Sequence, residues 1–340
     1  PGMDIFNDDA FSLQSLTAKV NAQAYVPGQI GASGLFEEDS VTTTTISVES
    51  IDGNLSLVEP TLRGGPGETA GTEKRGLVSF GVPHYERNDS VKADEVQNRR
   101  AFGTDSTAEA FADRVVAKQG RHLKALDATL EHQRLGAIKG VVSTKSNVVL
   151  ENLYTRFGIG VPAVVSLELD VDATKVSDLI QKNVIWSMED SLDDSYTGVH
   201  AFCGRDFFAA LWNHPWVRNT MLVAGSDAAM LRKELPEKFE YAGVTWERYR
   251  SGRKVGDGVT AAGGSFIAAG DAYLAPTGVS ELFITRFAPA DYIETVNTDG
   301  LPRYMKVIPM SNGKGADLEI QSNPISLCTR PGVLRKLTLT

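Results

Sequence analysis

The sequence predicts a mixed α+β fold, and three features of its pattern support that prediction. The first is a long polar hairpin between Val41 and Tyr85, and the second is a long amphipathic helix after it. The third is a region from Thr197 onward in which short strands and short helices follow one another. Hydrophobic residues make up 42% of the 340 residues, so the chain has ample material for a buried core in one or two domains.

The hairpin has little apolar surface of its own. Its first strand (residues 41–51) is polar and β-branched, a glycine-rich tip follows at residues 64–76, and the chain returns through residues 77–85. A two-stranded ribbon is marginally stable alone in water, and its unpaired edges invite pairing with another chain. We therefore expect a neighbouring copy of the protein to supply the partner, which indicates assembly rather than catalysis.

The helix after the hairpin is expected to run from Thr107 to Ile138. Ser106 and Glu109 fit a capping box at its start. At roughly 1.5 Å per residue the helix would measure about 48 Å, which suits a strut. Gly120 weakens its middle by about 1 kcal/mol relative to alanine. Apolar residues recur at helical spacing at Ala108, Phe111, Val115, Leu123, Leu126 and Leu130, and much of the polar side is expected from Asp113, Arg114, Lys118, Arg121 and Lys124.

The remaining elements are shorter. We expect irregular structure between Pro27 and Gly34, because proline and three glycines interrupt this stretch. Helices are expected at 10–21, 176–188, 206–214 and 228–234, and strands at 148–154, 163–169, 198–203, 244–249, 265–268, 272–275, 304–310, 318–322, 325–328 and 333–339.

Charge and composition exclude several classes of protein. The formal net charge of −9 disfavours a nucleic-acid-binding surface, which normally carries a basic face. It is compatible with a container whose inner wall must not adhere to nucleic acid. No apolar run of roughly 18 residues indicates a membrane span, and residues 1–20 do not read as a signal peptide. Cys203 and Cys328 lie outside any metal-ligand spacing, which favours reduced, partly buried thiols.

No motif identifies an enzyme. The five histidines are scattered, and the acidic run from Glu189 to Asp194 lacks the alternation of an EF-hand loop, so a solvated loop is favoured over a cation site. Residues 256–264 are glycine-rich but lack the Gly-Lys-Ser/Thr ending of a phosphate loop. His200 and Cys203 would point to opposite faces of one strand. We therefore predict no catalytic, cofactor-binding or metal-binding residues and no cofactor.

Basic residues cluster at three places in the sequence. Each cluster can serve contact with nucleic acid or salt bridges to acidic faces of neighbouring subunits, and we favour the subunit contacts. The clusters are Arg99-Arg100, then Arg250, Arg253 and Lys254, and finally Arg330, Arg335 and Lys336.

Taken in order, an extended N-terminal arm (residues 1–40), the hairpin, the strut helix and the compact α+β region resemble the major capsid protein E family of tailed bacteriophages. Residues 3–49 (MDIFNDDAFSLQSLTAKVNAQAYVPGQIGASGLFEEDSVTTTTISVE) look like that family's arm leading into its extended loop. Residues 305–339 (MKVIPMSNGKGADLEIQSNPISLCTRPGVLRKLTL) look like its terminal strands. The resemblance covers essentially the whole chain.

The resemblance implies the Hong Kong 97-like major capsid fold. Its parts would be an N-terminal arm at 1–38, an extended β-hairpin loop at 39–92 and a peripheral domain with the spine helix at 93–170. An axial domain would follow at 171–322, and C-terminal strands at 323–340 would return to the peripheral domain.

The resemblance also implies a function and partners. The protein would be the structural head protein of a tailed double-stranded DNA phage, assembling in the host cytoplasm as pentamers and hexamers and residing in the virion. Its partners would be further copies of itself, a portal, a possible decoration protein and packaged DNA bound without sequence specificity, with no membrane. Because only about 40 residues precede the hairpin, we expect scaffolding to be a separate protein.

Two groups of residues are expected to contact neighbouring subunits. Apolar residues of the arm should anchor it on an adjacent subunit: Phe6, Phe11, Leu13 and Leu16. Charged residues near the loop tip should pair with a neighbour's peripheral domain: Arg63, Glu68, Glu73, Lys74 and Arg75. Covalent cross-linking by a loop lysine is known in this fold, but for Lys74 an ordinary ion pair is favoured.

Two alternatives of different kinds stay open at this stage. One is an encapsulin-like nanocompartment shell, which would share the fold but enclose a cargo enzyme. The other is a soluble hydrolase that uses Cys203 or the acidic run. Thiol labelling that abolished an activity would favour the second.

Overall fold

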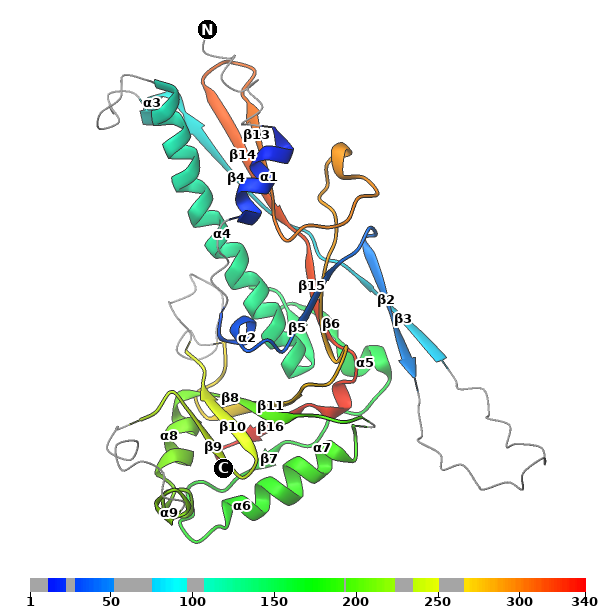
Figure 1. The fold of residues 1–340 in the computed structure, drawn as a ribbon, viewed down its shortest axis with the longest axis vertical. Coiled ribbons are helices and arrows are strands. Elements are labelled where there is room, and N and C mark those ends of the chain that lie inside the picture. The colour runs from blue at the N-terminus through cyan, green and yellow to red at the C-terminus, as the bar shows by residue number, and fades with distance from the viewer. Residues whose placement is uncertain are drawn as a thin grey trace, which may run out of the picture. The chain divides into compact units, whose positions relative to one another are not determined.

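The computed structural model describes residues 12–22, 28–51, 75–96, 107–192, 194–223, 235–250 and 266–340. Contacts divide the chain into two compact units (Figure 1). Unit 1 comprises Pro1–Ile46, Phe80–Gln133 and Ile284–Ser326, and unit 2 comprises Ser47–Ser79, Arg134–Phe283 and Leu327–Thr340. Each unit is therefore built from segments that lie far apart in the sequence.

The core of unit 1 lies on an antiparallel three-stranded sheet. Its order is β13 (Tyr304–Pro309), β14 (Gly315–Ser322) and β4 (Tyr85–Lys92), with Tyr304 opposite Gln321 and Tyr85 opposite Ser322. Helix α1 (Leu13–Ala22) packs against β13 (Figure 1). The cluster between these strands, α1 and helix α4 (Thr107–Lys139) consists of Leu16, Val20, Val91, Val115, Leu123, Leu126, Met305, Val307, Ala316, Leu318 and Ile320.

A second, smaller sheet lies mostly in unit 1. Strand β1 (Glu37–Ser40) pairs in parallel with β12 (Phe283–Phe287), and β12 also pairs with β15 (Pro324–Cys328). The buried hydroxyls of Thr285 and Ser326 join β12 and β15 at 3.0 Å. The unit also holds the short helices α2 (Gln29–Ala32), α3 (Ala93–Val96) and η4 (Ile293–Thr295).

Helix α4 (Thr107–Lys139) has 33 residues and confirms the predicted long helix, which it extends by one residue. Val115, Leu123, Leu126 and Leu130 are buried along it, as the periodicity predicted. Ser106 of the predicted capping box lies outside the described residues.

The predicted hairpin is present as two paired strands, β2 (Thr45–Ile51) and β3 (Arg75–Gly81). Among the described residues these strands form a two-stranded sheet of their own. We call this sheet the ribbon. Val82 continues the pairing by donating its amide to the carbonyl of Thr44 at 2.9 Å.

Unit 2 is built on a six-stranded sheet with the order β7-β16-β11-β8-β10-β9. Buried aromatic rings fill its core, with Phe207 and Trp246 at 6.1 Å between centroids and Phe239 in contact with Phe208 and Trp212. The strands are β7 (Val165–Ser166), β8 (Gly198–Cys203), β9 (Lys238–Tyr241), β10 (Val244–Arg248), β11 (Asp271–Thr277) and β16 (Arg335–Thr338).

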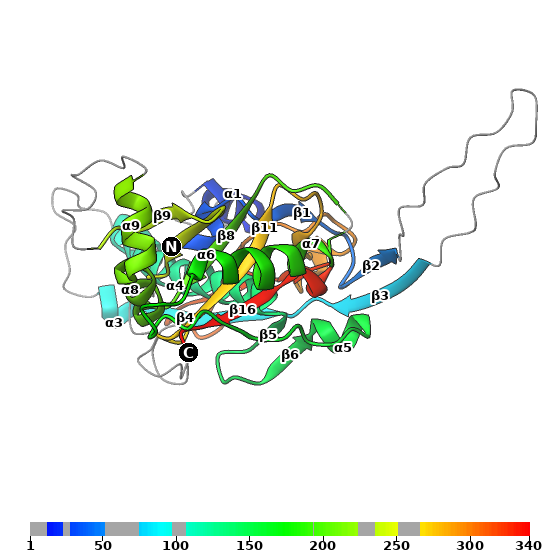
Figure 2. The same cartoon turned by 90° about the horizontal axis from the view of Figure 1, so that it is seen from below.

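Helices accompany this sheet (Figure 2). The predicted helix 176–188 is present as three consecutive parts, α6 (Val176–Leu179), the π-helical η3 (Ile180–Trp186) and α7 (Ser187–Glu189). Helix α8 (Arg205–Asn213) follows β8, α9 (Pro215–Val223) follows α8, and the short η5 (Pro331–Val333) precedes β16.

A short hairpin and helix complete unit 2. Strand β5 (Val141–Ser143) pairs antiparallel with β6 (Val149–Asn152), and α5 (Leu153–Phe157) follows directly. The Asn152 side chain accepts the Thr155 amide at 3.2 Å, and Gly158 ends α5 with a φ of +67°. The predicted strand 148–154 was therefore wrong after residue 152, because an asparagine cap starts a helix there.

Other sequence expectations need correction as well. The stretch after Pro27 is not wholly irregular, because α2 forms there. The expected strand at 265–268 is a bend at Phe266 and Ile267. Several elements were not expected at all, among them β1, β4, β5, β9, β12, α3 and α9. The expected helix at 228–234 lies outside the described residues, whereas β8 was predicted with its observed bounds.

Over the described ranges, no helix is both long enough and apolar enough to cross a membrane.

Candidate assembly surfaces

The structure places two of the predicted arm anchors inside their own subunit. Leu16 is buried in the core of unit 1, and Leu13 packs against the cluster of Ala290, Tyr292 and Tyr304. Both side chains hold α1 on its own unit, and a role on an adjacent subunit stays a prediction. Phe6 and Phe11 lie outside the described residues.

Polar contacts fasten the C-terminal end of α1. The Arg303 guanidinium donates to the Asp127 carboxylate of α4 at 2.6 Å and to the Val20 carbonyl at 3.5 Å. The side-chain amide of Asn21 in turn donates to the Arg303 carbonyl at 2.9 Å. The Arg303 side chain is only 8% exposed. A buried ion pair of this kind is costly to break, because the remaining charge stays out of water.

One turn further along α4, a second carboxylate fastens α2. Glu131 accepts the Ile30 amide at 2.9 Å and the Gly31 amide at 3.2 Å, so it satisfies free amides in the first turn of α2. A Cβ at Gly28 would overlap the Glu131 carboxyl group, so a larger residue there would displace that group from the amides of α2. Since residues four apart share one helix face, Asp127 and Glu131 together hold the described parts of the N-terminal segment (residues 12–22 and 28–32) on α4.

The ribbon is tied to unit 2 near its base. Ser47 and Ser79 face each other across its strands with their hydroxyls 3.1 Å apart. Arg156 of α5 donates to the Ser79 carbonyl and pairs with Glu151 at 3.3 Å. Leu77 of β3 is 66% exposed. The ribbon therefore has a fixed base and presents an apolar side chain to solvent.

The predicted tip residues cannot be placed. Arg63, Glu68, Glu73 and Lys74 lie outside the described residues, and Arg75 begins β3. Their pairing with a neighbouring subunit stays a prediction.

A charge cluster that the sequence did not reveal connects α4 with β4 and α3. Lys118 was expected on the polar side of the helix, but its side chain is only 9% exposed. It pairs with Glu95 at 2.9 Å and with Asp89 at 3.4 Å, and it donates to the Ser90 carbonyl. His122 lies 2.8 Å from the other oxygen of Asp89. A lysine inside an otherwise helical polar pattern gives no signal that it will be buried.

The same cluster shifts the pKa of two carboxyl groups. Burial by itself would raise the pKa of Asp89, but hydrogen bonds from His122, the Ser90 amide and Lys118 outweigh burial and lower it. The hydrogen bond from Lys118 is the main cause that lowers the pKa of Glu95. Both groups therefore stay ionised and help hold β4 and α3 against α4.

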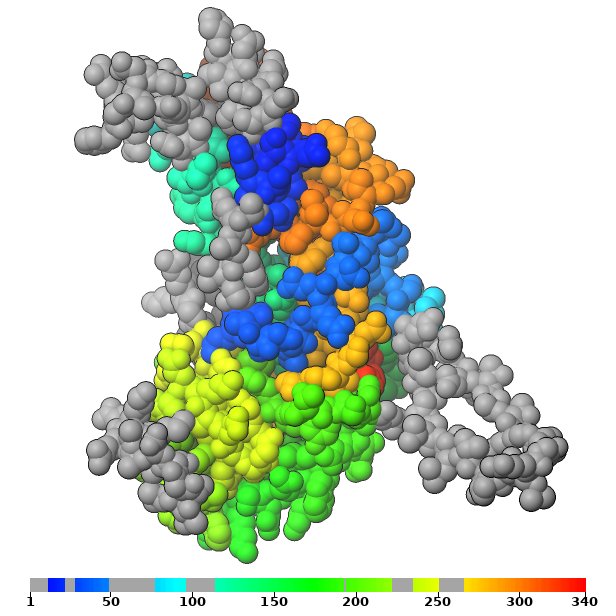
Figure 3. Space-filling model, viewed as in Figure 1, coloured from blue at the N-terminus to red at the C-terminus, as the bar shows by residue number. Residues whose placement is uncertain are grey.

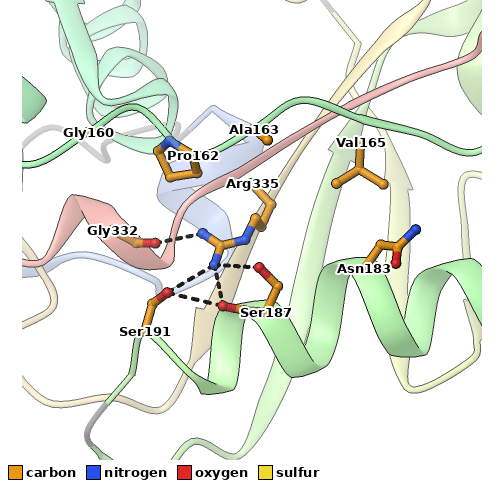
Figure 4. Close-up of a pocket in the computed structure, with 9 residues that line it drawn as sticks. All are labelled: Gly160, Pro162, Ala163, Val165, Asn183, Ser187, Ser191, Gly332 and Arg335. Carbon is orange, nitrogen blue, oxygen red and sulfur yellow. Dashed lines mark hydrogen bonds between the residues drawn. The ribbon is translucent and has the colours of Figure 1, made fainter.

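The C-terminal basic cluster makes its contacts within unit 2. Arg335 is buried, and its guanidinium donates to the hydroxyls of Ser187 and Ser191 and to the carbonyls of Ser187, Gly332 and Leu334 (Figure 4). Arg335 also lines a cavity of about 310 Å³ beside Pro162 and Asn183.

The other described basic residues of the predicted clusters are also paired inside the chain. Lys336 pairs with Asp271 at 2.8 Å and Arg330 with Asp194 at 3.2 Å. Arg250 pairs with Glu237 at 2.9 Å. Arg99, Arg100, Arg253 and Lys254 lie outside the described residues.

Comparison with known proteins identifies the family. A family described as phage major capsid protein E matches residues 12–339. The chain belongs to this family. The resemblance inferred from the arm and the terminal strands is thereby confirmed, and the protein is a structural major capsid protein.

Curated relatives of this major capsid protein carry the same description. The major capsid protein of Pseudomonas phage KPP10 is 27% identical over 323 residues, spanning 89% of this chain and 90% of the relative. That of Salmonella phage Felix O1 is 25% identical over 360 residues, spanning 95% of each chain. These relatives do not favour the encapsulin-like alternative.

Solved structures show the same fold at low sequence identity. A putative capsid protein of a prophage from E. coli CFT073 superposes with a TM-score of 0.61 at 12% identity, covering 96% of this chain and 99% of that one. The capsid of cyanophage P-SCSP1u gives a TM-score of 0.53 at 13% identity, covering 93% and 90%. The mixed α/β architecture of this family member is thus that of phage capsid proteins.

The residues considered as catalytic or metal-binding candidates are the two cysteines and the acidic run, and in this capsid protein the cysteines are buried and two of the acids are paired. Burial raises the pKa of the Cys203 thiol, and it raises that of Cys328 to about 12, so both thiols are poor nucleophiles. Within the acidic run, Glu189 accepts the Tyr196 hydroxyl and Asp194 pairs with Arg330. Among the residues described, no group of three or more His, Cys, Asp or Glu side chains can hold a metal ion.

Proposed function

We propose that this major capsid protein assembles as pentamers and hexamers into the closed icosahedral head of a tailed double-stranded DNA phage. The observation that supports this most directly is the ribbon, whose two strands pair with each other and with no further strand among the described residues. Sheet edges left open in this way invite pairing with another chain. A shell supplies such a neighbour at every position.

The finer organisation belongs to the same proposal. We propose the Hong Kong 97-like subdomains with α4 as the spine helix, although contacts group β13 and β14 of the assigned axial range with unit 1 and β16 with unit 2. The ribbon of one subunit would extend over a neighbour's peripheral domain, where Arg63, Glu68, Glu73, Lys74 and Arg75 would make charge pairs. Glycines at the tip would let the loop change its tilt during expansion of the head, because glycine adopts backbone conformations closed to other residues.

Multivalency would stabilise the shell. Each contact between two subunits can be weak, because many contacts per subunit close at once in a shell. We also propose four partners: a separate scaffolding protein, a portal, a decoration protein outside the shell and packaged DNA inside it. Assembly would take place in the host cytoplasm. We propose no enzymatic activity.

Electron microscopy of the purified protein, with light scattering to give its mass, tests the proposal. Closed polyhedral shells, or rings of five and six subunits, are expected. A monodisperse monomer or dimer, with and without scaffolding protein, would refute the shell.

A further inference from the structure

The loop between β12 and β13 presents two large apolar side chains to solvent. Ile293 is 92% exposed and Val296 is 64% exposed, and both lie at the short helix η4. The segment, orange in the colour scale, lies at the molecular surface in Figure 3. Isoleucine and valine are among the residues most often buried. We call Ile293 and Val296 the apolar tip.

The loop is held in one conformation from within. The Thr295 hydroxyl donates to the Ala290 carbonyl at 2.7 Å and to the Tyr292 carbonyl at 3.0 Å. Tyr292 and Thr295 are buried, whereas their neighbours in the apolar tip point outward. Lys306 of β13 lies 4.8 Å from the centre of the Tyr292 ring and bonds Glu294 at 3.0 Å.

Both ends of the loop are fixed as well. The Asn323 side chain donates to the Pro289 carbonyl at 2.8 Å, and the Ala288 amide donates to the Asn323 carbonyl at 2.9 Å. At Gly300 a Cβ would overlap the Phe287 carbonyl, so the chain must pass there as glycine. The loop therefore holds the two side chains of the apolar tip in a fixed, exposed position. Such preorganisation lowers the entropy lost on binding.

A second exposed apolar surface lies on the β5–β6 hairpin of unit 2. Val148, Val149 and Leu150 follow one another there, and all three are exposed, Val148 by 62%. Among the described residues β6 pairs only with β5. The Thr144 amide donates to the Val148 carbonyl at 2.8 Å and closes the turn that carries Lys145. This hairpin is thus a formed, apolar surface beside an exposed cation.

Charge distinguishes this hairpin from another exposed apolar stretch of unit 2, Ile159–Val164. Asp291, Glu294 and Asp299 are exposed around the apolar tip, and they complement Lys145 of the hairpin. The alternative stretch, Ile159–Val164, contributes Pro162 and Ala163 to the cavity that Ser187 and Ser191 also line. Glu189 and Asp190 are exposed between those two serines, and like charges would repel the acids of the apolar tip.

We propose that the apolar tip of one copy docks on residues 148–150 of the β5–β6 hairpin of a second copy, with Lys145 facing the acids of the tip. Because two different surfaces of the chain meet, the contact is heterologous and repeats around a ring of subunits. The inference rests on the proposed function, since the shell supplies the second copy.

Mixed assembly of two cysteine variants tests the contact. Subunits carrying Ile293→Cys are co-assembled with subunits carrying Val149→Cys under mild oxidation, so that any disulfide between these positions must join two chains. Cys203 and Cys328 are buried and do not compete. A covalent dimer that depends on both variants is expected. Two outcomes in well-formed shells would overturn the proposal. One is a dimer that forms with a Val161→Cys partner and not with Val149→Cys, and the other is the absence of dimers with either partner.

A matched pair of substitutions measures the contribution of the tip. Ile293→Asp is expected to lower the yield of shells by at least about tenfold, the change that ~1.4 kcal/mol makes in an association constant. Ile293→Leu keeps the apolar contact and should give wild-type yield. Neither should change the melting temperature of the subunit, because Ile293 is almost wholly exposed. Wild-type yield from Ile293→Asp would contradict the docking alone, whereas absence of wild-type shells would refute the shell function and the docking with it.

Discussion

The N-terminal segment (residues 12–22 and 28–32) and the ribbon are both expected to reach neighbouring subunits, yet their packing differs. In the segment Val20 and Ile30 are fully buried, and Asp127, Glu131 and Arg303 satisfy the helix ends. The ribbon pairs only with itself among the described residues and leaves Leu77 exposed. The difference indicates that changes in the segment alter the stability of a subunit, whereas changes in the ribbon alter assembly.

Deletion of Arg63–Arg75 is expected to have the largest effect. The subunit should fold with its normal melting temperature, because the cores of both units lie elsewhere, but closed shells should be absent. Electron microscopy and circular dichroism measure the two outcomes. A glycine–serine segment of equal length is the control for length alone. Normal shells from the deletion would show that the tip is dispensable.

At the contacts that hold the N-terminal segment, Arg303→Ala should destabilise the subunit by about 3 kcal/mol, because it leaves the Asp127 carboxylate partly buried without its cation. Chemical denaturation monitored by fluorescence gives this free energy of unfolding. Lys306→Ala removes a more exposed lysine of the same sheet and serves as the control, with a loss below about 1 kcal/mol. Equal losses in the two variants would mean that burial of Arg303 is unimportant.

A smaller loss, about 1–3 kcal/mol, is expected for Glu131→Ala, because the buried Ile30 and Gly31 amides lose their acceptor. Gly28→Ala should cost a similar amount, since the added methyl group overlaps that carboxyl group. The double variant should lose less than the sum of the single losses, as residues in direct contact do. Strict additivity of the three measured unfolding free energies would argue against the contact.

The smallest effect is a pH dependence that distinguishes the carboxyl groups on β4 and α3 from the one on α4. The pKa of Asp89 and of Glu95 is lowered, so their contribution is present above the ordinary values of 3.8 and 4.5 and is lost as the pH falls through the lowered values. Burial raises the pKa of Asp127 although Arg303 opposes it, so acid relieves the cost of its charge instead.

Lys118→Met isolates this effect. The difference in melting temperature between wild type and variant should be largest near pH 6 and shrink toward pH 3, because the lysine stabilises only ionised carboxylates. Lys124→Met, on an exposed face of α4, should show no such trend. A constant difference for Lys118→Met across this range would mean that its packing, not its charge, matters.

Local patterns in the sequence determined several elements outright. The period of apolar residues defined α4 to within one residue, and the bounds of β8 were predicted as observed. Local signals also mark the ends of α5, at Asn152 and Gly158, and the start of α9, at Pro215. These features are readable because the interactions behind them lie within a few residues.

Only the tertiary structure decided the polar contacts. Asp127 and Glu131 look like ordinary surface acids of a helix, and Lys118 like a surface base, until segments around a hundred or more residues away cover the first two. Strand β12, the central strand of its sheet, gave no period because successive residues, which point to opposite faces, are buried alike. The sequence by itself therefore determined the family, the long helix and the polar ribbon. Which charges are buried was decided by contacts between distant segments, because burial depends on what covers a side chain and not on its neighbours in the chain.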